Sequence, residues 1–194
     1  MRILGIDPGT ATSGYGVIDV NKEIIDVVGW GLIETDKTGT TANRLEAIYK
    51  ATGAIIKKFS PDIFVIEKIF FATNAKTAIA VGQAQGVMML TASKAKLKVA
   101  EYAPGTIKKM VTGDGRAKKK DIQKSVRKIL GNKVRSKSKK KTHFDNAADA
   151  LAVALCHYYK LGGLPHGALP RRQGGLAKGG LPHGALAKGG ENNG

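Results

Sequence analysis

The sequence predicts an α/β domain in which a mixed five-stranded sheet is flanked by helices. Two observations lead to this class. The chain begins with three strand-like segments separated by turn residues, and strand-like and helical segments then alternate. One later strand-like segment is an almost continuous apolar run, which is typical of a central strand covered on both faces. Alternating strands and helices are typical of a sheet with helices packed against it.

The first part of the chain predicts three consecutive strands. Arg2–Asp7 (RILGID) is the first, and a glycine-rich turn at Pro8–Gly14 separates it from Tyr15–Val20. A third strand is predicted at Ile24–Glu34, after a short polar turn. Thr41–Phe59 is predicted to be a helix, because its apolar residues recur at intervals of three and four and form one stripe.

The rest of the chain alternates between strands and helices. The predicted elements are a strand at Ile63–Ile69, a helix at Asn74–Lys96, a strand at Val99–Ala103, short basic helices at Pro104–Val111 and Lys118–Leu130, a polar loop at Gly131–Thr142 and a helix at Asp145–Lys160. Together with the first four elements, this order matches an RNase H-like layout.

Two glycines interrupt the long Ala-rich helix. Gly82 and Gly86 each cost roughly 1 kcal/mol of helix stability relative to Ala. Small residues four apart lie on one side of a helix and allow another helix to come close. We therefore expect these two glycines to form a packing face.

The composition changes near residue 161. Residues 1–160 are predicted to form the folded domain, whereas residues 161–194 hold 11 glycines and repeat the motif GGLPHGAL at Gly162–Leu169 and Gly179–Leu186. Such a composition buries too little apolar surface to offset the entropy of ordering the chain. We therefore expect this tail to be disordered.

The charge balance indicates a polyanionic partner. The 194 residues carry a net charge of +17, which favours nucleic acid first and an anionic membrane surface second. The alternative is a basic but otherwise ordinary protein. From Lys108 to Lys141 there are 15 Lys and Arg and two Asp, a local net charge of +13. Because such a run repels itself, phosphate contacts explain it better than a solvated face, and DNA binding should depend steeply on salt.

Other sequence features predict a cytoplasmic protein. The single cysteine, Cys156, excludes an internal disulfide and fits a reducing compartment. The apolar run at the N-terminus is interrupted by Asp7 and is too short for a signal-peptide core. No stretch of about 18 apolar residues is present, so no membrane span is expected.

Two acidic residues stand at informative places in the predicted strands. Asp7 ends the first strand, where an Asp is either a turn residue or a ligand. Glu67 interrupts the apolar run IFVIEKI, where an unpaired charge is costly to bury. An edge position or pairing with Lys68 is the alternative, but adjacent strand residues point to opposite faces. A metal ion therefore explains Glu67 better than Lys68 does.

A third acidic residue lies in the last predicted helix. Asp149 belongs to NAADALAVALCH, and Asp145 and Asn146 lie four and three residues before it, on about the same face. Acidic residues are common in the first turn of a helix, because they interact favourably with its dipole. This accounts for Asp145 but poorly for Asp149, which lies one turn deeper in an Ala-rich stretch.

The three carboxylates predict a metal-dependent nuclease. Oxygen ligands suit Mg²⁺, which retains several waters and binds few carboxylates together with substrate phosphates. Two such ions about 3.5–4 Å apart activate a water and stabilise the leaving oxygen in phosphodiester hydrolysis. We expect Asp7, Glu67 and Asp149 to bind two Mg²⁺ ions, with Mn²⁺ as a substitute.

Four motifs resemble one known family. They are GIDPGTATSGYGVI, FVIEKIFFATNAKTA followed by GQAQGV, EYAPGTIKKMVTGDGRAKK and NAADALAVALCH. In this order and spacing they resemble the RuvC family of Holliday junction resolvases, over residues 1 to about 160 and without the tail. The resemblance implies an RNase H-like homodimer that binds a four-way DNA junction and nicks two strands of like polarity symmetrically. A branch-migration motor complex is a further implied partner.

The resemblance also implies the ligands of the metal. Asp7, Glu67 and Asp149 match three of the family's four metal-binding positions, and Asn146 stands at the fourth, where members have Asp or His. Asn offers only a neutral oxygen, so one unit of charge is missing. Three explanations stay open: Asp145 takes its place, the lineage tolerates Asn with weaker metal binding, or an Asp→Asn change leaves a protein that binds junctions without cutting them.

Further positions match DNA-binding residues of the family. Phe70 matches an aromatic residue that stacks on a base at the opened junction centre, with Phe71 beside it, although an aromatic residue after a strand is more often part of a core. Lys108 and Lys119 match basic positions that act in binding and catalysis.

Two other classes remain as alternatives. IDPGTATSG also resembles the phosphate loop of actin-like and sugar-kinase ATPases, but these enzymes need two such domains, and residues 1–160 are too few. Resolvases of the YqgF type share the RNase H-like fold, but FVIEKIFF followed by GQAQGV favours the RuvC family.

Overall fold

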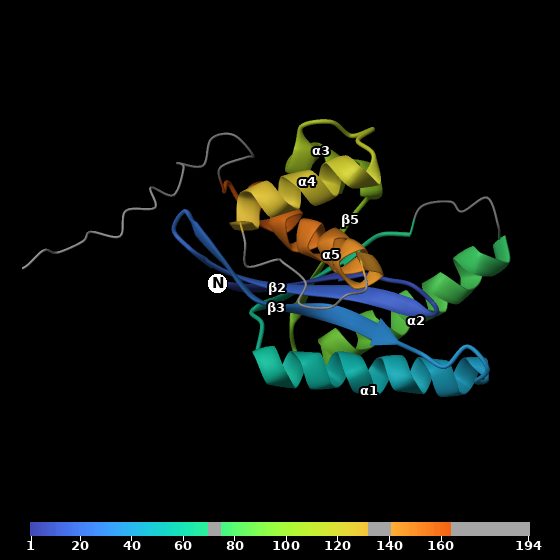
Figure 1. Ribbon diagram of the computed structural model, residues 1–194. Coiled ribbons are helices and arrows are strands. Elements are labelled where there is room, and N and C mark those ends of the chain that lie inside the picture. Colours follow the sequence, from blue (N-terminus) through green and yellow to red (C-terminus); the bar gives the residue numbers. More distant parts are fainter. Residues whose placement is uncertain (70–74, 132–140, 164–194) are drawn as a thin grey trace, which may run out of the picture.

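Five strands form one mixed sheet in the order β3-β2-β1-β4-β5 (Figure 1). The computed structural model describes residues 1–69, 75–131 and 141–163, with the backbone alone for 141–146. β1 pairs antiparallel with β2 and parallel with β4, β2 pairs antiparallel with β3, and β4 pairs parallel with β5. The strands are β1 (Arg2–Asp7), β2 (Thr12–Asn21), β3 (Ile24–Glu34), β4 (Ile63–Glu67) and β5 (Lys98–Tyr102).

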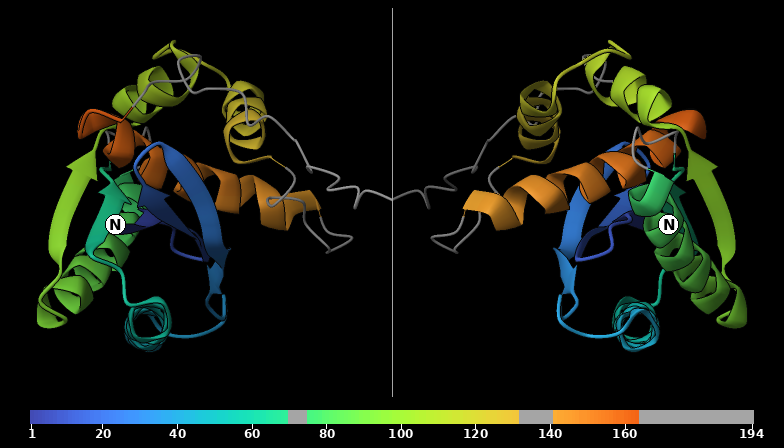
Figure 2. Two further views of the ribbon diagram at one scale, coloured as in Figure 1. Left: turned by 90° about the vertical axis from the view of Figure 1, so that its left-hand side faces the viewer. Right: turned by 90° about the vertical axis from the view of Figure 1, so that its right-hand side faces the viewer.

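Helices cover both faces of this sheet (Figures 1 and 2). Two helices, α1 and α2, lie on one face, α5 lies on the other, and α3 and α4 pack over α5. The helices are α1 (Thr41–Phe59), α2 (Ala75–Lys94), α3 (Pro104–Thr112), α4 (Lys119–Leu130) and α5 (Lys141–Lys160). The predicted α/β class, with a mixed five-stranded sheet and flanking helices, is confirmed.

Several element ends differ from the predicted ones. β2 begins at Thr12, inside the predicted turn, because Thr12 already pairs with Glu34 of β3. β4 ends at Glu67, two residues before the predicted end. α5 begins at Lys141, so the polar loop predicted to reach Thr142 ends earlier. The first turn of α5 is polar and shows no apolar periodicity, which is why the sequence placed its start too late.

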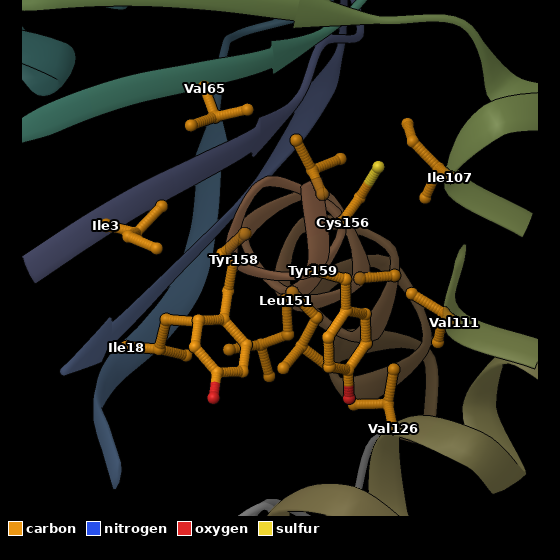
Figure 3. Close-up of a cluster of buried hydrophobic side chains, with 14 of the residues drawn as sticks. Ile3, Ile18, Val65, Ile107, Val111, Val126, Leu151, Cys156, Tyr158 and Tyr159 are labelled. Atoms are coloured by element: carbon orange, nitrogen blue, oxygen red, sulfur yellow. The ribbon is translucent and has the colours of Figure 1, made fainter. Parts of the chain in front are cut away.

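The sheet separates two apolar clusters. Leu4, Ile6, Phe64 and Ile66 belong to the cluster on the side of α1 and α2. Alternate residues of the same strands point to the other face, where α5 is buried along most of its length (Figure 3). That cluster joins strand residues Ile3, Ile18 and Val65, α5 residues Leu151, Cys156, Tyr158 and Tyr159, and α3 and α4 residues Ile107, Val111 and Val126.

Among the described residues, no helix packs closely against the predicted packing face of α2. A Cβ added at Gly86 would meet no atom within 4 Å, and one at Gly82 would meet only the Ile69 side chain, at 3.8 Å. The residues of α2 that pack into the core are Ala84, Met88 and Ala92. The two glycines therefore face away from the neighbouring helix.

Other sequence predictions concern the whole chain. Cys156 is buried, and burial raises the pKa of its thiol to about 12. Within the described ranges, no helix is both long and apolar enough to span a membrane. The predicted disordered tail lies outside the described residues from residue 164 onward, as do Phe70 and Phe71.

Candidate active site

The first two carboxylates lie side by side at the end of the sheet. Asp7 is the last residue of β1 and Glu67 the last residue of β4. These strands are parallel neighbours in which Ile6 is opposite Ile66, so the next residue of each strand emerges at the same edge. The alternation that directs Ile3 and Val65 toward α5 also directs Asp7 and Glu67 to that face. The two side chains share a hydrogen bond.

The third carboxylate comes from α5. This helix crosses the sheet very closely at Gly5, where an added Cβ would lie 2.3 Å from the Ala150 carbonyl oxygen and 2.6 Å from the Ala154 nitrogen. Gly16 on β2 allows a similar approach to Leu151. Because Asp149 directly precedes Ala150, this packing brings its carboxylate to the same pocket as Asp7.

The chain on either side of the carboxylates is fixed by hydrogen bonds. After Asp7, the Gly9 N–H donates to Ser13 Oγ (3.0 Å), and the Arg44 guanidinium donates to the Thr10 carbonyl oxygen (2.5 Å). After Glu67, the Lys68 N–H donates to the Tyr102 carbonyl oxygen (2.8 Å). These contacts explain how two loop-flanked residues keep a defined position.

Tyr102 also ties β5 to α5. Its hydroxyl lies 2.8 Å from Nδ1 of His157, two helical turns beyond Asp149. Burial lowers the pKa of His157 and so favours its neutral imidazole. β5, which lies beside Glu67, is thereby linked directly to the helix that carries Asp149.

One pocket, of about 210 Å³, holds the three carboxylates and two lysines. Lys119 Nζ lies 2.9 Å from Asp149 Oδ2, and half-buried Lys108 is close enough to Glu67 to act on its charge. The pocket is lined by Asp7, Glu67, Pro104, Ile107, Lys108, Lys119, Ile122, Asp149 and Ala152.

The carboxylates hold more negative charge than the pocket balances. Burial raises the pKa of Asp7 well above its usual range, and the charges of Glu67 and Asp149 raise it further. Burial also raises the pKa of Glu67, although the hydrogen bond from Asp7 opposes this. The shared hydrogen bond raises the pKa of Asp7 and lowers that of Glu67, so Asp7 is its donor and Glu67 its acceptor. Lys68 is exposed beyond β4, so the positive charges that act on Glu67 come from Lys108 and Lys119.

The residues present fit a divalent cation. The hydrogen bond between Asp7 and Glu67 marks a place where two oxygens already converge, and an all-oxygen donor set suits Mg²⁺ or Mn²⁺. Among the described side chains, no three Asp, Glu, His or Cys residues stand close enough together to hold an ion. One Asp149 oxygen is instead engaged by Lys119. Asp7 and Glu67 are thus the preassembled part of the site.

The remaining predicted site residues are only partly described. Asp145 and Asn146 lie on α5, about one turn before Asp149, and their side chains are outside the described part of the structure. Phe70 and Phe71 are outside it entirely. The roles predicted for these four residues stay predictions.

The sequence missed the Lys119–Asp149 pair. Lys119 is the first residue of α4, and the N-terminus of a helix is the end at which the helix dipole disfavours a cation. A lysine at such an unfavourable position indicates a nearby acidic partner, and this was the signal available in the sequence. The apolar walls of the pocket, Ile107 and Ile122, were also missed, because they look like ordinary core positions of amphipathic helices.

Comparisons with known proteins agree with this geometry. The family model described as crossover junction endodeoxyribonuclease RuvC matches residues 3–157. The chain is 41% identical to the RuvC of Fusobacterium nucleatum, over 84% of this chain and 82% of that protein. It is 44% identical to the RuvC of Caldicellulosiruptor saccharolyticus, over 81% of this chain and 92% of that protein.

A solved structure of a RuvC protein also matches this chain. The RuvC of Thermus thermophilus, in complex with a Holliday junction substrate, superposes with a TM-score of 0.73 at 29% identity. The match covers 84% of this chain and 96% of that one. The sequence match, the shared fold and the carboxylate-lined pocket together establish that this chain belongs to the RuvC family of crossover junction endodeoxyribonucleases.

Proposed function

We propose that this protein resolves four-way DNA junctions by paired symmetric nicks. The observation that carries the proposal is the meeting of Asp7, Glu67 and Asp149 in one pocket with two lysines. Relatives of the chain bear the name crossover junction endodeoxyribonuclease, and the Thermus protein was solved with a Holliday junction substrate. Membership of this family also favours a nuclease over the ATPase alternative.

Family membership implies the use of a divalent metal, and we propose Mg²⁺, two ions to a site. Asp7, Glu67 and Asp149 would hold the ions, with Asn146 or Asp145 as the fourth ligand. Bound there, the ions would activate water and stabilise charge on the phosphodiester. Mn²⁺ prefers similar oxygen ligands and would substitute for Mg²⁺.

The lysines and the pocket walls serve the same reaction. Lys108 and Lys119 present ammonium groups where a scissile phosphate would enter, and they would stabilise the charge that develops on its oxygens. Ile107 and Ile122 are 4% and 7% exposed and form apolar walls. Such walls exclude water and strengthen the electrostatic interactions inside the pocket.

The layer formed by α3 and α4 provides a surface for the DNA backbone. On α4, Ile122, Val126 and Leu130 point into the core, whereas the basic side chains Lys124 and Lys128 are exposed. This arrangement places positive charge beside the pocket. Contacts to phosphate position a duplex without reading its bases, so these lysines would recognise the shape of the junction.

We also propose that two copies pair through α2. Ile79 and Leu90 on this helix are 65% and 57% exposed, and Gly86 lies between them with open space above it. Their spacing puts the three residues on one stripe, where a second helix could approach closely. Symmetric nicking requires two active sites, which such a pair would supply. Assembly with a branch-migration motor rests on family resemblance alone.

The function is tested on a synthetic four-way junction with one labelled strand at a time. In Mg²⁺ or Mn²⁺ the protein should nick two strands of like polarity at symmetric positions and leave a linear duplex intact. Asp7→Asn and Glu67→Gln should abolish nicking and retain junction binding. Asp114→Asn, which changes an exposed acid outside the pocket, is the control. Normal cutting by both active-site variants would refute the carboxylate assignment.

A second candidate function is junction binding without cleavage, and Asn146 is the observation that favours it. A comparison of the unaltered protein with its Asn146→Asp variant on the same junction distinguishes binding without cleavage from cleavage. A gain of cleavage in the variant would show that Asn146 limits catalysis. Strong and equal cleavage by both proteins would show that Asn146 is tolerated or that Asp145 replaces it.

A further inference from the structure

Within the pocket, the contact between Lys119 and Asp149 opposes metal binding. Lys119 Nζ lies 2.9 Å from Asp149 Oδ2, and this is an oxygen of a proposed metal ligand. Lys119 is held at the first position of α4, whose start is fixed by the Lys118 N–H donating to Asp121 Oδ2 (3.2 Å). A cation is unfavourable at this end of a helix, so the preferences of the helix do not account for a lysine at this position.

The exposure of the lysine indicates a weak ion pair. The Lys119 side chain is 54% exposed and that of Asp149 18%. A half-exposed ion pair is weak, because water solvates the ammonium group in either position. The lysine stem is flexible, so the ammonium group can swing within its reach while the α4 backbone stays in place.

We propose that Lys119 exchanges partners: it neutralises Asp149 when no divalent cation is bound, and it turns to a DNA phosphate when a cation takes its place. This rests on the proposed function, because it takes the ligand role of Asp149 and the DNA substrate from it. A dication attracts the carboxylate more strongly than an ammonium group at the same distance does. Lys119 then adds a phosphate contact that it does not make while paired with Asp149.

Exchange makes metal binding and DNA binding cooperative. The coupling is reciprocal by thermodynamic necessity: if a cation releases Lys119 for DNA, then DNA draws Lys119 away from Asp149 and favours the cation. The site would therefore load its metal most readily when a substrate phosphate is in place.

The first test measures Mn²⁺ affinity by calorimetry on the full chain without DNA. Lys119→Met removes the competing ammonium group and should tighten Mn²⁺ binding roughly two- to fivefold. Lys120→Met is the matched control, since it removes the same charge one residue along α4 outside the pocket lining. Equal effects of the two substitutions would overturn the proposal, because general electrostatics would then explain both.

The second test measures junction affinity against KCl concentration, in EDTA and in Ca²⁺. The slope of log K against log [KCl] should be steeper by about 0.9 in Ca²⁺ for the unaltered protein, which corresponds to one more phosphate contact. Lys120→Met should keep this difference and Lys119→Met should lose it. The same difference in Lys119→Met as in the unaltered protein would overturn the proposal.

The outcomes distinguish this inference from the proposed function. A protein that nicks junctions and binds Mn²⁺, but whose Lys119→Met variant behaves like Lys120→Met, refutes partner exchange alone. A protein that binds no Mn²⁺ and nicks no junction refutes both.

Discussion

At the scale of single residues, the carboxylates that would bind metal lower the stability of the folded chain when no metal is present. Burial and neighbouring charges raise the pKa of Asp7, so the folded chain holds a proton there more tightly than the unfolded chain does. This contribution to stability is fully present below the ordinary pKa of Asp and is lost as pH rises through the raised pKa. At neutral pH in the absence of metal, the Asp7 carboxyl therefore contributes less to stability than it does in acid.

Asp7→Asn should consequently stabilise the protein in EDTA while abolishing cleavage. Asn keeps the size and polarity of the side chain but carries no charge to repel Glu67 or Asp149. The melting temperature of the variant relative to the unaltered protein should rise as pH increases above the ordinary pKa of Asp, by about 2–4 °C for each kcal/mol gained. In Mg²⁺ the order should reverse, because the unaltered protein gains ligand stabilisation. A difference in melting temperature that shrinks as pH increases above the ordinary pKa of Asp would contradict the assignment.

The sequence predicted individual acidic residues better than it predicted their partners. Asp7 and Glu67 were identifiable because a charge at the end or in the middle of an apolar strand is costly without a ligand. Lys119 was assigned through family resemblance alone. Its pairing with Asp149 was not foreseen, because that contact joins two helices separated by a basic loop. No local pattern encodes which side chain a lysine will meet across such a distance.

At the scale of elements, Gly5 determines how closely α5 packs on the sheet. Gly5→Ala should displace α5, because the new Cβ would meet backbone atoms of Ala150 and Ala154 instead of a movable side chain. Overpacking of this kind costs about 1–3 kcal/mol of folding stability. Since Asp149 lies on the displaced turn, Mn²⁺ affinity and junction cleavage should fall even where the protein is still folded.

A matched control for this prediction is Gly53→Ala on α1, in the opposite layer. An added Cβ there meets only the Thr91 methyl group at 3.8 Å, and helix propensity should raise stability by about 0.5–1 kcal/mol. Denaturant unfolding gives the stability of both variants, and calorimetry gives their Mn²⁺ affinity. Full Mn²⁺ affinity in folded Gly5→Ala would show that Gly5 does not position Asp149.

The elements themselves were mostly predictable, since α1 and β3 begin and end where the apolar periodicity does. The errors arose where pairing or polarity overrides that pattern. β2 extends to Thr12 because β3 offers a partner strand, and α5 starts at Lys141 although its first turn carries no apolar stripe. Gly82 and Gly86 were expected to form a packing face, but among the described residues Gly86 faces open space.

At the scale of the whole molecule, one chain offers one active site, whereas a junction presents two strands to cut. The exposed stripe of Ile79, Gly86 and Leu90 on α2 is the surface that a second copy would cover. In a two-fold pair, each residue near the axis meets the same residue of the partner. A charge introduced there would therefore be repelled by its own copy and would also lose water, so it should break the pair while leaving each chain folded.

Leu90→Glu is accordingly expected to yield a folded monomer. Sedimentation should show half the mass of the unaltered protein, and the melting temperature at matched subunit concentration will report any stability that came from pairing.

A supercoiled plasmid with an extruded cruciform reports the function: paired nicks give linear product, whereas separate nicks give open circles first. The variant should shift the product from linear to open circular. Ile24→Glu, at an equally exposed apolar residue of β3 (58%), should change neither mass nor product. An unchanged mass for Leu90→Glu would exclude α2 as the pairing surface. Linear product from a variant shown to be monomeric would mean that coordinated cleavage does not require pairing.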